Sequence, residues 1–565
     1  MRRKEVLALQ ADPRSPEHGQ YGFLQDLVRR VAYDTLSRRE RRARHLAAAE
    51  QIGSSYGSEE EAVEVIASHY VAAYEAAPDA DGAEEIKAKA RETLVRAGEH
   101  AASLAAAAEA RRYYERAAEL AEDTVERAGL LEEAGFMAGR AHGVDAAKPL
   151  FEAALDLYDT VGDTHGAARA SMRLGRFQLF GGDREEALAR LERAYEVISA
   201  DEPGDDLADL AAMLARAYWY SGQTELSAER AELALDIAEA RRIPQSLVSA
   251  LLAKAFVAYS RAHDAESVAL IKYALELALE HDLFEAASRC YFLLSDRCFR
   301  TDRYREALAY LDESLALARR VGDRPYEWGV LAERCYPLLL LGEWDEVIAT
   351  RNDFTQEQID AGGVVLSMLQ GGVEIYAHRG ELDEARLLLS QFTRLEHSTD
   401  LQDRGNYLGT VAVLRRMEGR LDEALAAGMA ILELVPTLGG AQQNVKHALI
   451  DALEAALALG DTARAEELFA FVDTLAPGRR PPYLDAHLQR LRARLAGDAD
   501  GFDAAAHRFR ELDSPFSLAV TLLDRAETLG DDEARAEAVE IFERLRATPW
   551  LERAASAPRT TEVLA

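Results

Sequence analysis

Four arginines are the residues whose type and spacing most directly predict a chemical role. Arg169, Arg173 and Arg176 follow one another at helical spacing, and Arg216 lies 40 positions after Arg176. Residues four and seven apart in a helix share one face, so a helix here would present the first three arginines together. A guanidinium forms two parallel hydrogen bonds to a carboxylate or phosphate. The four arginines therefore predict a groove for an acidic peptide or an anionic small molecule.

Two aromatic residues follow the last of these arginines. Trp219 and Tyr220 lie three and four positions after Arg216 and would add flat surfaces to the same groove. A second interpretation is that the arginines pair with the many neighbouring Glu and Asp residues. That alternative is the favoured one, because 99 acidic residues outnumber 66 basic ones in this chain.

The segment Arg38-Arg39-Glu40-Arg41-Arg42-Ala43-Arg44 is the other concentration of positive charge. Residues 1–50 carry 11 Arg and Lys against 7 acids, a net +4, so the remainder of a chain of net charge −33 carries −37. The segment is interpreted either as a surface that contacts DNA or nucleotide, or as a docking or solvated helix. The second interpretation is preferred, because a strongly acidic surface repels nucleic acid.

Motifs for catalysis, metal binding and phosphate binding are missing from the sequence. There is no HExxH and no His/Cys pair at ligand spacing, and none of the seven lysines follows a glycine as a phosphate-binding loop requires. The three cysteines, Cys290, Cys298 and Cys335, include no CxxC and are predicted to be reduced and buried. We therefore predict a non-enzyme with no catalytic residue, metal or cofactor.

Composition and length limit the fold and the compartment. At 565 residues the chain is too long for one compact core, and it is 48% hydrophobic but only 7% aromatic, which is typical of helical proteins. No apolar run reaches the ~18 residues of a membrane span, and the first residues lack the apolar core of a secretory signal. A cytoplasmic protein without membrane contact is predicted.

The elements that would position these residues repeat along the chain. A glycine followed by a polar residue, or an equivalent turn, recurs about every 40 residues. A small residue follows several of these glycines by five positions, as at Ala187, Ala385, Ala424 and Ala465, which lets two helices approach closely. The turn glycines are Gly143, Gly182, Gly222, Gly342, Gly380, Gly419, Gly460 and Gly497, with further turns at His263-Asp264 and Asp302-Arg303.

This pattern resembles the tetratricopeptide repeat. Leu174-Gly175, Gly182-Asp183, Ala187 and Ala194 match its Leu-Gly pair, turn and two alanines. The step of about 40 exceeds the usual 34, as in the superhelical sensor arms of large bacterial signalling ATPases. The resemblance implies an all-α fold, an α-solenoid of about eleven helix hairpins.

A second resemblance covers the start of the chain. Residues 21–49, YGFLQDLVRRVAYDTLSRRERRARHLAAA, are similar to the segment that follows the AAA-type ATPase in multidomain class III adenylate/guanylate cyclase-like proteins. There the segment closes a winged-helix-like module, and the likeness extends to residues 63–70, 97–117 and 542–552. The resemblance implies a helical winged-helix-like remnant over 1–52, a helical linker over 53–96, a superhelix over 97–555 and a disordered tail over 556–565.

The function implied is that of a regulatory, sensor or protein-interaction module whose cyclase and ATPase domains lie outside this sequence. A protein or peptide partner, or an anionic small molecule, is expected to bind it, with nucleic acid an unfavoured partner. Two alternatives stay open. One is a DNA-associated transcriptional regulator that uses the Arg-rich segment, and the other is part of an active nucleotide cyclase.

Overall fold

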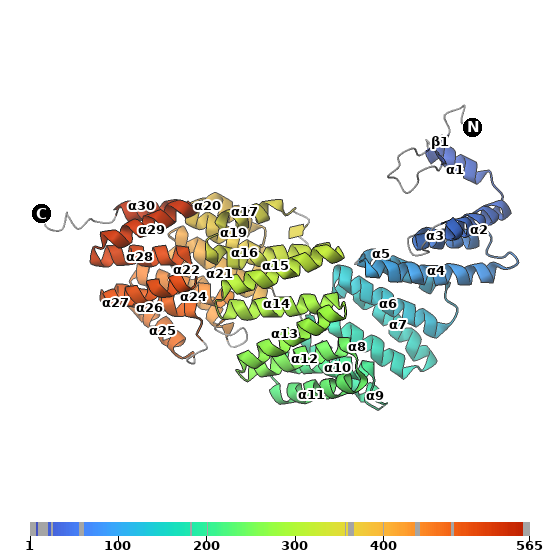
Figure 1. Ribbon diagram of the computed structural model, residues 1–565, viewed down its shortest axis with the longest axis horizontal. Helices are drawn as coiled ribbons and strands as arrows, with labels where there is room; N and C mark the ends of the chain where they lie inside the picture. Colours follow the sequence, from blue (N-terminus) through green and yellow to red (C-terminus); the bar gives the residue numbers. More distant parts are fainter. Residues whose placement is uncertain are drawn as a thin grey trace. The chain divides into compact units, whose positions relative to one another are not determined.

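The computed structural model describes residues 7–9, 21–23, 26–55, 62–104, 106–180, 183–200, 202–355, 358–359, 366–398, 401–435, 441–475 and 480–556. The chain divides into two compact units, which we call the N-terminal unit (Met1–Gln223) and the C-terminal unit (Thr224–Ala565). Each is built from helices joined in hairpins by short turns (Figure 1). The predicted all-α solenoid is therefore confirmed.

The N-terminal unit begins with two short strands, β1 (Leu7–Leu9) and β2 (Tyr21–Phe23), paired antiparallel with Leu7 opposite Phe23. The all-helical start predicted for residues 1–52 misses this pairing, because strands of three residues are too short to show an alternating pattern. The helices that follow are α1 (Asp26–Asp34), α2 (Arg38–Ser55), α3 (Val63–Ala76), α4 (Ala83–Ser103), α5 (Ala107–Leu120), α6 (Thr124–His142), α7 (Val144–Val161), α8 (Thr164–Phe180), α9 (Arg184–Ile198) and α10 (Asp205–Tyr220).

Helix α2 begins with a hydrogen-bonded cap. Ser37 and Glu40 form a capping box: the Glu40 carboxylate accepts from the Ser37 N–H at 2.9 Å, and the Glu40 N–H donates to Ser37 Oγ at 3.3 Å. The predicted linker over 53–96 contains α3 and most of α4, and α4 continues past residue 96 to Ser103. Beyond Ser556, the predicted disordered tail lies outside the described residues.

The C-terminal unit continues the hairpins. Its helices are α11 (Thr224–Arg241), α12 (Pro244–Ser260), α13 (Asp264–Glu280), α14 (Phe284–Arg300), α15 (Tyr304–Val321), α16 (Arg324–Leu341), α17 (Trp344–Asp353), α19 (Leu366–Arg379), α20 (Leu382–Ser390), α21 (Leu401–Met417), α22 (Leu421–Leu432), α24 (Gln443–Leu459), α25 (Thr462–Asp473), α26 (Pro482–Ala496), α27 (Ala499–Glu511), α28 (Pro515–Leu529), α29 (Asp532–Leu545) and α30 (Thr548–Ser556), with a 3-10 turn η3 (Thr393–His397).

The turn residues end helices as their sequence pattern predicts. The turn glycines in the described part of the chain have positive φ between 66° and 84°, which glycine adopts at little cost. At two turns without glycine, Ala262 and Asp302 also have positive φ, of 64° and 58°. Gly182 lies outside the described residues.

Small residues allow the close packing of paired helices. Ala187, Ala385 and Ala424 are fully buried, and a Cβ added to Gly175 would lie 3.1 Å from Leu191 Cδ2. The three cysteines are buried and unpaired, and burial raises the pKa of the Cys290 thiol to about 12. The predicted buried thiols are confirmed.

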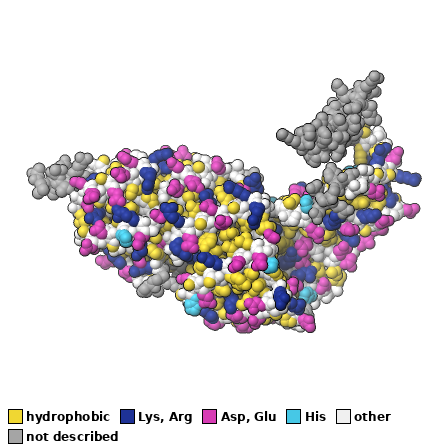
Figure 2. Space-filling view, in the orientation of Figure 1, with side chains coloured by type: hydrophobic (Ala, Val, Ile, Leu, Met, Phe, Trp, Pro, Cys, Tyr) yellow, Lys and Arg dark blue, Asp and Glu magenta, His cyan; other side chains and the backbone are white. Residues whose placement is uncertain are grey.

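In the C-terminal unit the first helices of successive hairpins form one continuous layer. Helices α16, α19, α21, α24, α26 and α28 each contact the next, and the layer curves so far that α16 meets α28 and α19 meets α30. On the face shown in Figure 2, basic and acidic side chains are interspersed rather than separated by sign. The curvature encloses polar side chains that the sequence places up to two hundred residues apart.

Candidate functional site

Long-range polar contacts close the curved layer of the C-terminal unit. The Lys446 ammonium on α24, fully buried, donates to the Phe299 carbonyl at 2.9 Å and to the buried Asp302 carboxylate. The other oxygen of Asp302 accepts the backbone N–H of Tyr483 at 2.7 Å. Three parts of the chain, separated by about 37 to 180 positions, are thus tied together in the interior.

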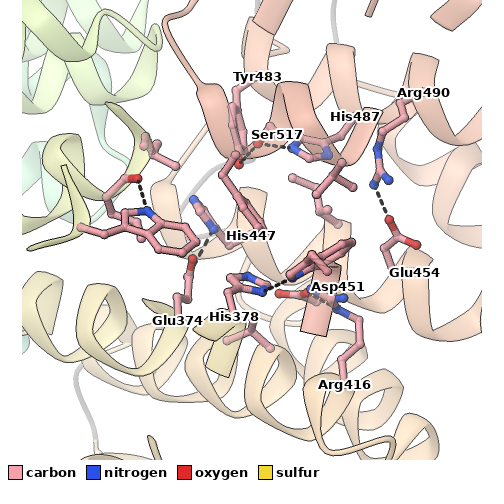
Figure 3. A pocket seen from close by; sticks show the side chains of 18 residues that line it. Glu374, His378, Arg416, His447, Asp451, Glu454, Tyr483, His487, Arg490 and Ser517 are labelled. Carbon is pink, nitrogen blue, oxygen red and sulfur yellow. Dashed lines mark hydrogen bonds and ion pairs between the residues drawn. The ribbon is translucent and has the colours of Figure 1, made fainter. Parts of the chain in front are cut away.

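A cavity of about 60 Å³ lies inside this closed layer (Figure 3). Its walls come from α16, α17, α19, α21, α24, α26, α28 and α30, and it combines aromatic rings with an unusual number of buried polar groups. The lining residues are Leu339, Leu340, Trp344, Glu374, His378, Val413, Arg416, His447, Ile450, Asp451, Glu454, Tyr483, His487, Arg490, Phe516, Ser517, Val520 and Trp550. We call this the central cavity.

Aromatic packing fixes one wall of the central cavity. The Trp550 indole N–H donates to His378 Nδ1 at 3.2 Å, and the Phe516 ring lies 4.3 Å from the His378 ring, centroid to centroid. Since Nδ1 accepts, a neutral His378 carries its proton on Nε2. Burial, with Arg416 nearby, lowers the pKa of His378 to about 3, so the ring is neutral near pH 7.

Carboxylates and bases alternate along the other walls. His447 Nδ1 lies 3.3 Å from Glu374 Oε1, and Arg416 Nε donates to Asp451 Oδ1 at 2.6 Å. Arg490 bridges two helices, contacting Glu454 and donating to Asp524 at 2.5 Å.

These pairs account for the pKa shifts of the carboxylates. Burial alone would raise the pKa of Glu454, but Arg490 and Arg494 outweigh it, and the pKa falls below its usual range. For Asp451 burial is the stronger effect, and its pKa is raised despite Arg416. The positive and negative groups of the cavity therefore largely balance one another.

The last polar cluster in the wall of the central cavity consists of Ser517, Tyr483 and His487. Ser517 Oγ lies 3.0 Å from the Tyr483 hydroxyl and 3.2 Å from His487 Nε2. His487 is only 6% exposed, yet its Nδ1 has no hydrogen-bond partner within the described part of the chain. A Ser–His pair resembles a nucleophile with its base, but such a pair needs a third group on the other ring nitrogen. Among the described residues no such third group is present.

The first two predicted arginines are engaged by a buried carboxylate. Arg169 donates to both oxygens of Glu132 at 3.2 and 3.1 Å, and Arg173 donates to Glu132 at 2.9 Å and Glu133 at 2.7 Å. Glu132 is 1% exposed, so the two guanidinium groups neutralise a charge that would otherwise be buried alone. Arg169 and Arg173 therefore pair with neighbouring acidic residues, as the second interpretation of the sequence expects.

The other predicted groove residues lie on α8 and α10. Arg176 has its guanidinium 5.6 Å from the centroid of the Phe136 ring, and Arg216 is buried. Trp219 and Tyr220 pack edge to face with centroids 5.0 Å apart. A ligand role for the six residues stays a prediction.

Within the Arg-rich helix α2, two arginines are held by intramolecular contacts. Arg41 Nε donates to the Leu36 carbonyl at 3.1 Å, and Arg42 donates to the Asp81 carbonyl at 2.7 Å. These contacts support the interpretation of α2 as a docking or structural helix rather than a DNA-contacting one.

The residues of the central cavity were not predicted from the sequence. One signal was available: His447 and His487 lie 40 positions apart, one repeat step, and therefore occupy the same position in successive hairpins. Among the described residues there is no cluster of three or more His, Cys, Asp or Glu suited to a metal, and no helix long and apolar enough to cross a membrane.

No protein-family profile and no curated protein sequence matches the chain. Solved helical-repeat structures resemble it at low identity. The Rap protein in complex with Competence and Sporulation Factor is 15% identical over 64% of this chain and 99% of its own, with a TM-score of 0.43. A Signal Transduction ATPase with Numerous Domains with a tetratricopeptide repeat sensor, from Pyrococcus horikoshii, is 15% identical over 74% of this chain and 66% of its own, with a TM-score of 0.44. The human IFIT1 dimer with m7Gppp-AAAA is 15% identical over 69% and 90%, with a TM-score of 0.38.

Proposed function

We propose that this chain is a helical-repeat scaffold that works by binding, as the regulatory or sensor part of a cyclase/ATPase-type signalling protein. The observation that supports binding is the central cavity. Packing helices into a solenoid requires only apolar contacts, and buried ion pairs often stabilise a fold less than apolar residues of similar size. Titratable groups held in a cavity with perturbed pKa values are typical of functional sites.

The size of the central cavity limits what it accepts. Its volume of about 60 Å³ is a few times the roughly 10–15 Å³ that one water molecule needs, and far below the roughly 300–1,000 Å³ of drug-sized pockets. The occupant is therefore a small polar molecule, or one side chain of a peptide partner. Because its charged groups are already paired, the cavity favours an occupant that is itself uncharged.

The signalling context rests on the resemblance of residues 21–49 to the segment after the ATPase in cyclase-like proteins. In such an arrangement the solenoid would bind the signal and α2 would face the ATPase. Arg42 ties α2 to the turn before α4 through the Asp81 carbonyl, which would hold the helix in place for such docking.

Binding in the central cavity is tested by ligand-dependent thermal stabilisation. A ligand that occupies the cavity at 100 times its dissociation constant stabilises the fold by about 2.7 kcal/mol. His487→Phe replaces a polar lining ring by a larger apolar one and should abolish the shift. His507→Phe is the matched control, since His507 is 75% exposed and does not line the cavity. Equal stabilisation of both variants would refute the assignment.

The regulatory role is tested with a cyclase/ATPase protein of this type. We expect the purified chain alone to turn over neither ATP nor GTP, and its addition to change the ATPase or cyclase rate of that partner. Turnover by the chain itself that survives repeated purification would contradict the non-catalytic role, and an unchanged partner rate would contradict the regulatory one.

A further inference from the structure

A second, larger cavity lies where the curved layer of the C-terminal unit closes. Its volume is about 490 Å³, and arginines from four different elements line it: Arg305, Arg379, Arg510 and Arg544. We call this the closure cavity. Trp344 lines both this cavity and the central cavity, so the indole is part of the wall between them.

Three of the four arginines are positioned by acids. Arg305 donates to Asp513 at 2.6 Å, Arg510 donates to Glu537 at 2.7 Å, and Arg379 donates to Asp345 at 2.7 Å. Each ion pair leaves other guanidinium N–H groups available, since a guanidinium has five.

The fourth arginine is different. Arg544 is exposed and has no carboxylate partner among the residues that the structure describes.

Two helix N-termini also open into the closure cavity. One is the start of α17, where residues 342–345 line the cavity, and the other is the start of α28, where Ser514 and Pro515 line it. Neither helix has a side-chain N-cap hydrogen bond. The two starts touch, since a Cβ on Gly342 would lie 2.6 Å from Pro515 Cγ. First-turn N–H groups lack intrahelical acceptors, although Pro515 contributes none at α28, and each helix start carries about +0.5 charge.

The side-chain charges around the closure cavity balance. The four arginines face Glu343, Asp345 and Asp513 in the lining and Glu537, the partner of Arg510. The two helix starts add about +1 together, so the positive excess comes from their backbone N–H groups. Arg544 and these helix starts are therefore the groups suited to bind an anion.

We propose that the closure cavity binds the dianionic phosphate group of a small phosphorylated molecule. A phosphate monoester carries close to two negative charges near pH 7, and its three oxygens match arginine forks and backbone N–H groups. The volume exceeds that of a bare phosphate and lies within the range of about 300–1,000 Å³ of small-molecule sites. The bound ligand would bridge α15 and α19 with α27 and α29, strengthening closure of the layer.

The experiment is calorimetric titration of the full chain with glycerol 3-phosphate, inorganic phosphate and uncharged glycerol. We expect both phosphates to bind and glycerol not to bind. Tighter binding of glycerol 3-phosphate identifies a phosphorylated molecule as the ligand class. Equal binding of the two phosphates, or no phosphate binding at millimolar concentration, would overturn that assignment.

Matched substitutions locate the site. Arg544→Gln should weaken phosphate binding about tenfold, because it removes a charge-assisted hydrogen bond, and adding Arg510→Gln should weaken it further. Arg508→Gln is the control: it lies on the same helix as Arg510, has similar exposure and pairs with Glu511, but does not line the closure cavity. Unchanged affinity in Arg544→Gln, or equal losses in the control, would refute the site. His487→Phe should retain phosphate binding, which separates this proposal from the central cavity.

Discussion

The buried pair of Lys446 and Asp302 gives the sharpest test of how the C-terminal unit closes. Both side chains are fully inaccessible, and Asp302 also accepts hydrogen bonds from the Tyr304 hydroxyl at 2.9 Å and the Tyr483 N–H at 2.7 Å. Lys446→Met removes the only cation that contacts Asp302 in the described part of the chain. A carboxylate is then buried with neutral donors alone, which costs about 3–5 kcal/mol.

Removing the acid instead of the base should lower the free energy of unfolding by a similar amount, because a buried positive charge then lacks its partner. Asp302→Asn keeps the size of the side chain and its bond to Tyr483, but it leaves the Lys446 ammonium buried without a counter-charge. The double variant buries no charge at this position and should lie within about 2 kcal/mol of the unmodified chain, because paired removal of buried ions is often close to neutral. The coupling energy of the cycle is then about 3 kcal/mol or more.

The assay is urea unfolding followed by tryptophan fluorescence, since Trp328, Trp344 and Trp550 report on the C-terminal unit. Lys254→Met is the control, because Lys254 pairs with the exposed Glu232 and its loss should cost less than about 1 kcal/mol. Additive single substitutions, or a Lys446→Met variant as stable as the control, would show that the pair does not hold the layer closed.

Three further outcomes are expected. Acid should destabilise the C-terminal unit between about pH 6.5 and pH 3, by about 1.4 kcal/mol per pH unit for His378. Burial lowers the folded pKa of His378 to about 3, so in this range the unfolded chain binds a proton that the folded chain does not. Chemical denaturation across pH should show a weaker dependence of the unfolding free energy on pH in His378→Gln and an unaltered one in His507→Gln. The two units should unfold separately, since repeat hairpins contact mainly their neighbours, and hydrogen exchange followed by mass spectrometry in rising urea should show two transitions rather than one. If the N-terminal unit binds an acidic peptide, replacing Arg176 and Arg216 by Ala should weaken that binding at least about tenfold, as measured by titration, while helicity is preserved. Unaltered affinity would leave these arginines with a structural role only.

The sequence determined the local structure because the signals involved are local. A glycine every forty or so positions ends a helix in the left-handed conformation, and Ala187, Ala385 and Ala424 occupy the close approaches between paired helices. Such features depend on residues within one or two turns of each other. The repeat step therefore predicted the all-α solenoid and the burial of its small residues.

Which distant residues meet was decided only by the tertiary structure. The curvature of a solenoid is a small rotation added at each hairpin, and the repeat step in the sequence does not contain its size. Trp550 consequently meets His378 across 172 positions, and Lys446 meets Asp302 across 144. Arg169 and Arg173 share the predicted helix, yet it is the neighbouring α6 that supplies Glu132 as their partner. Period and turn chemistry act along the chain, whereas ion pairs and cavities arise from the accumulated rotation that brings separate hairpins together.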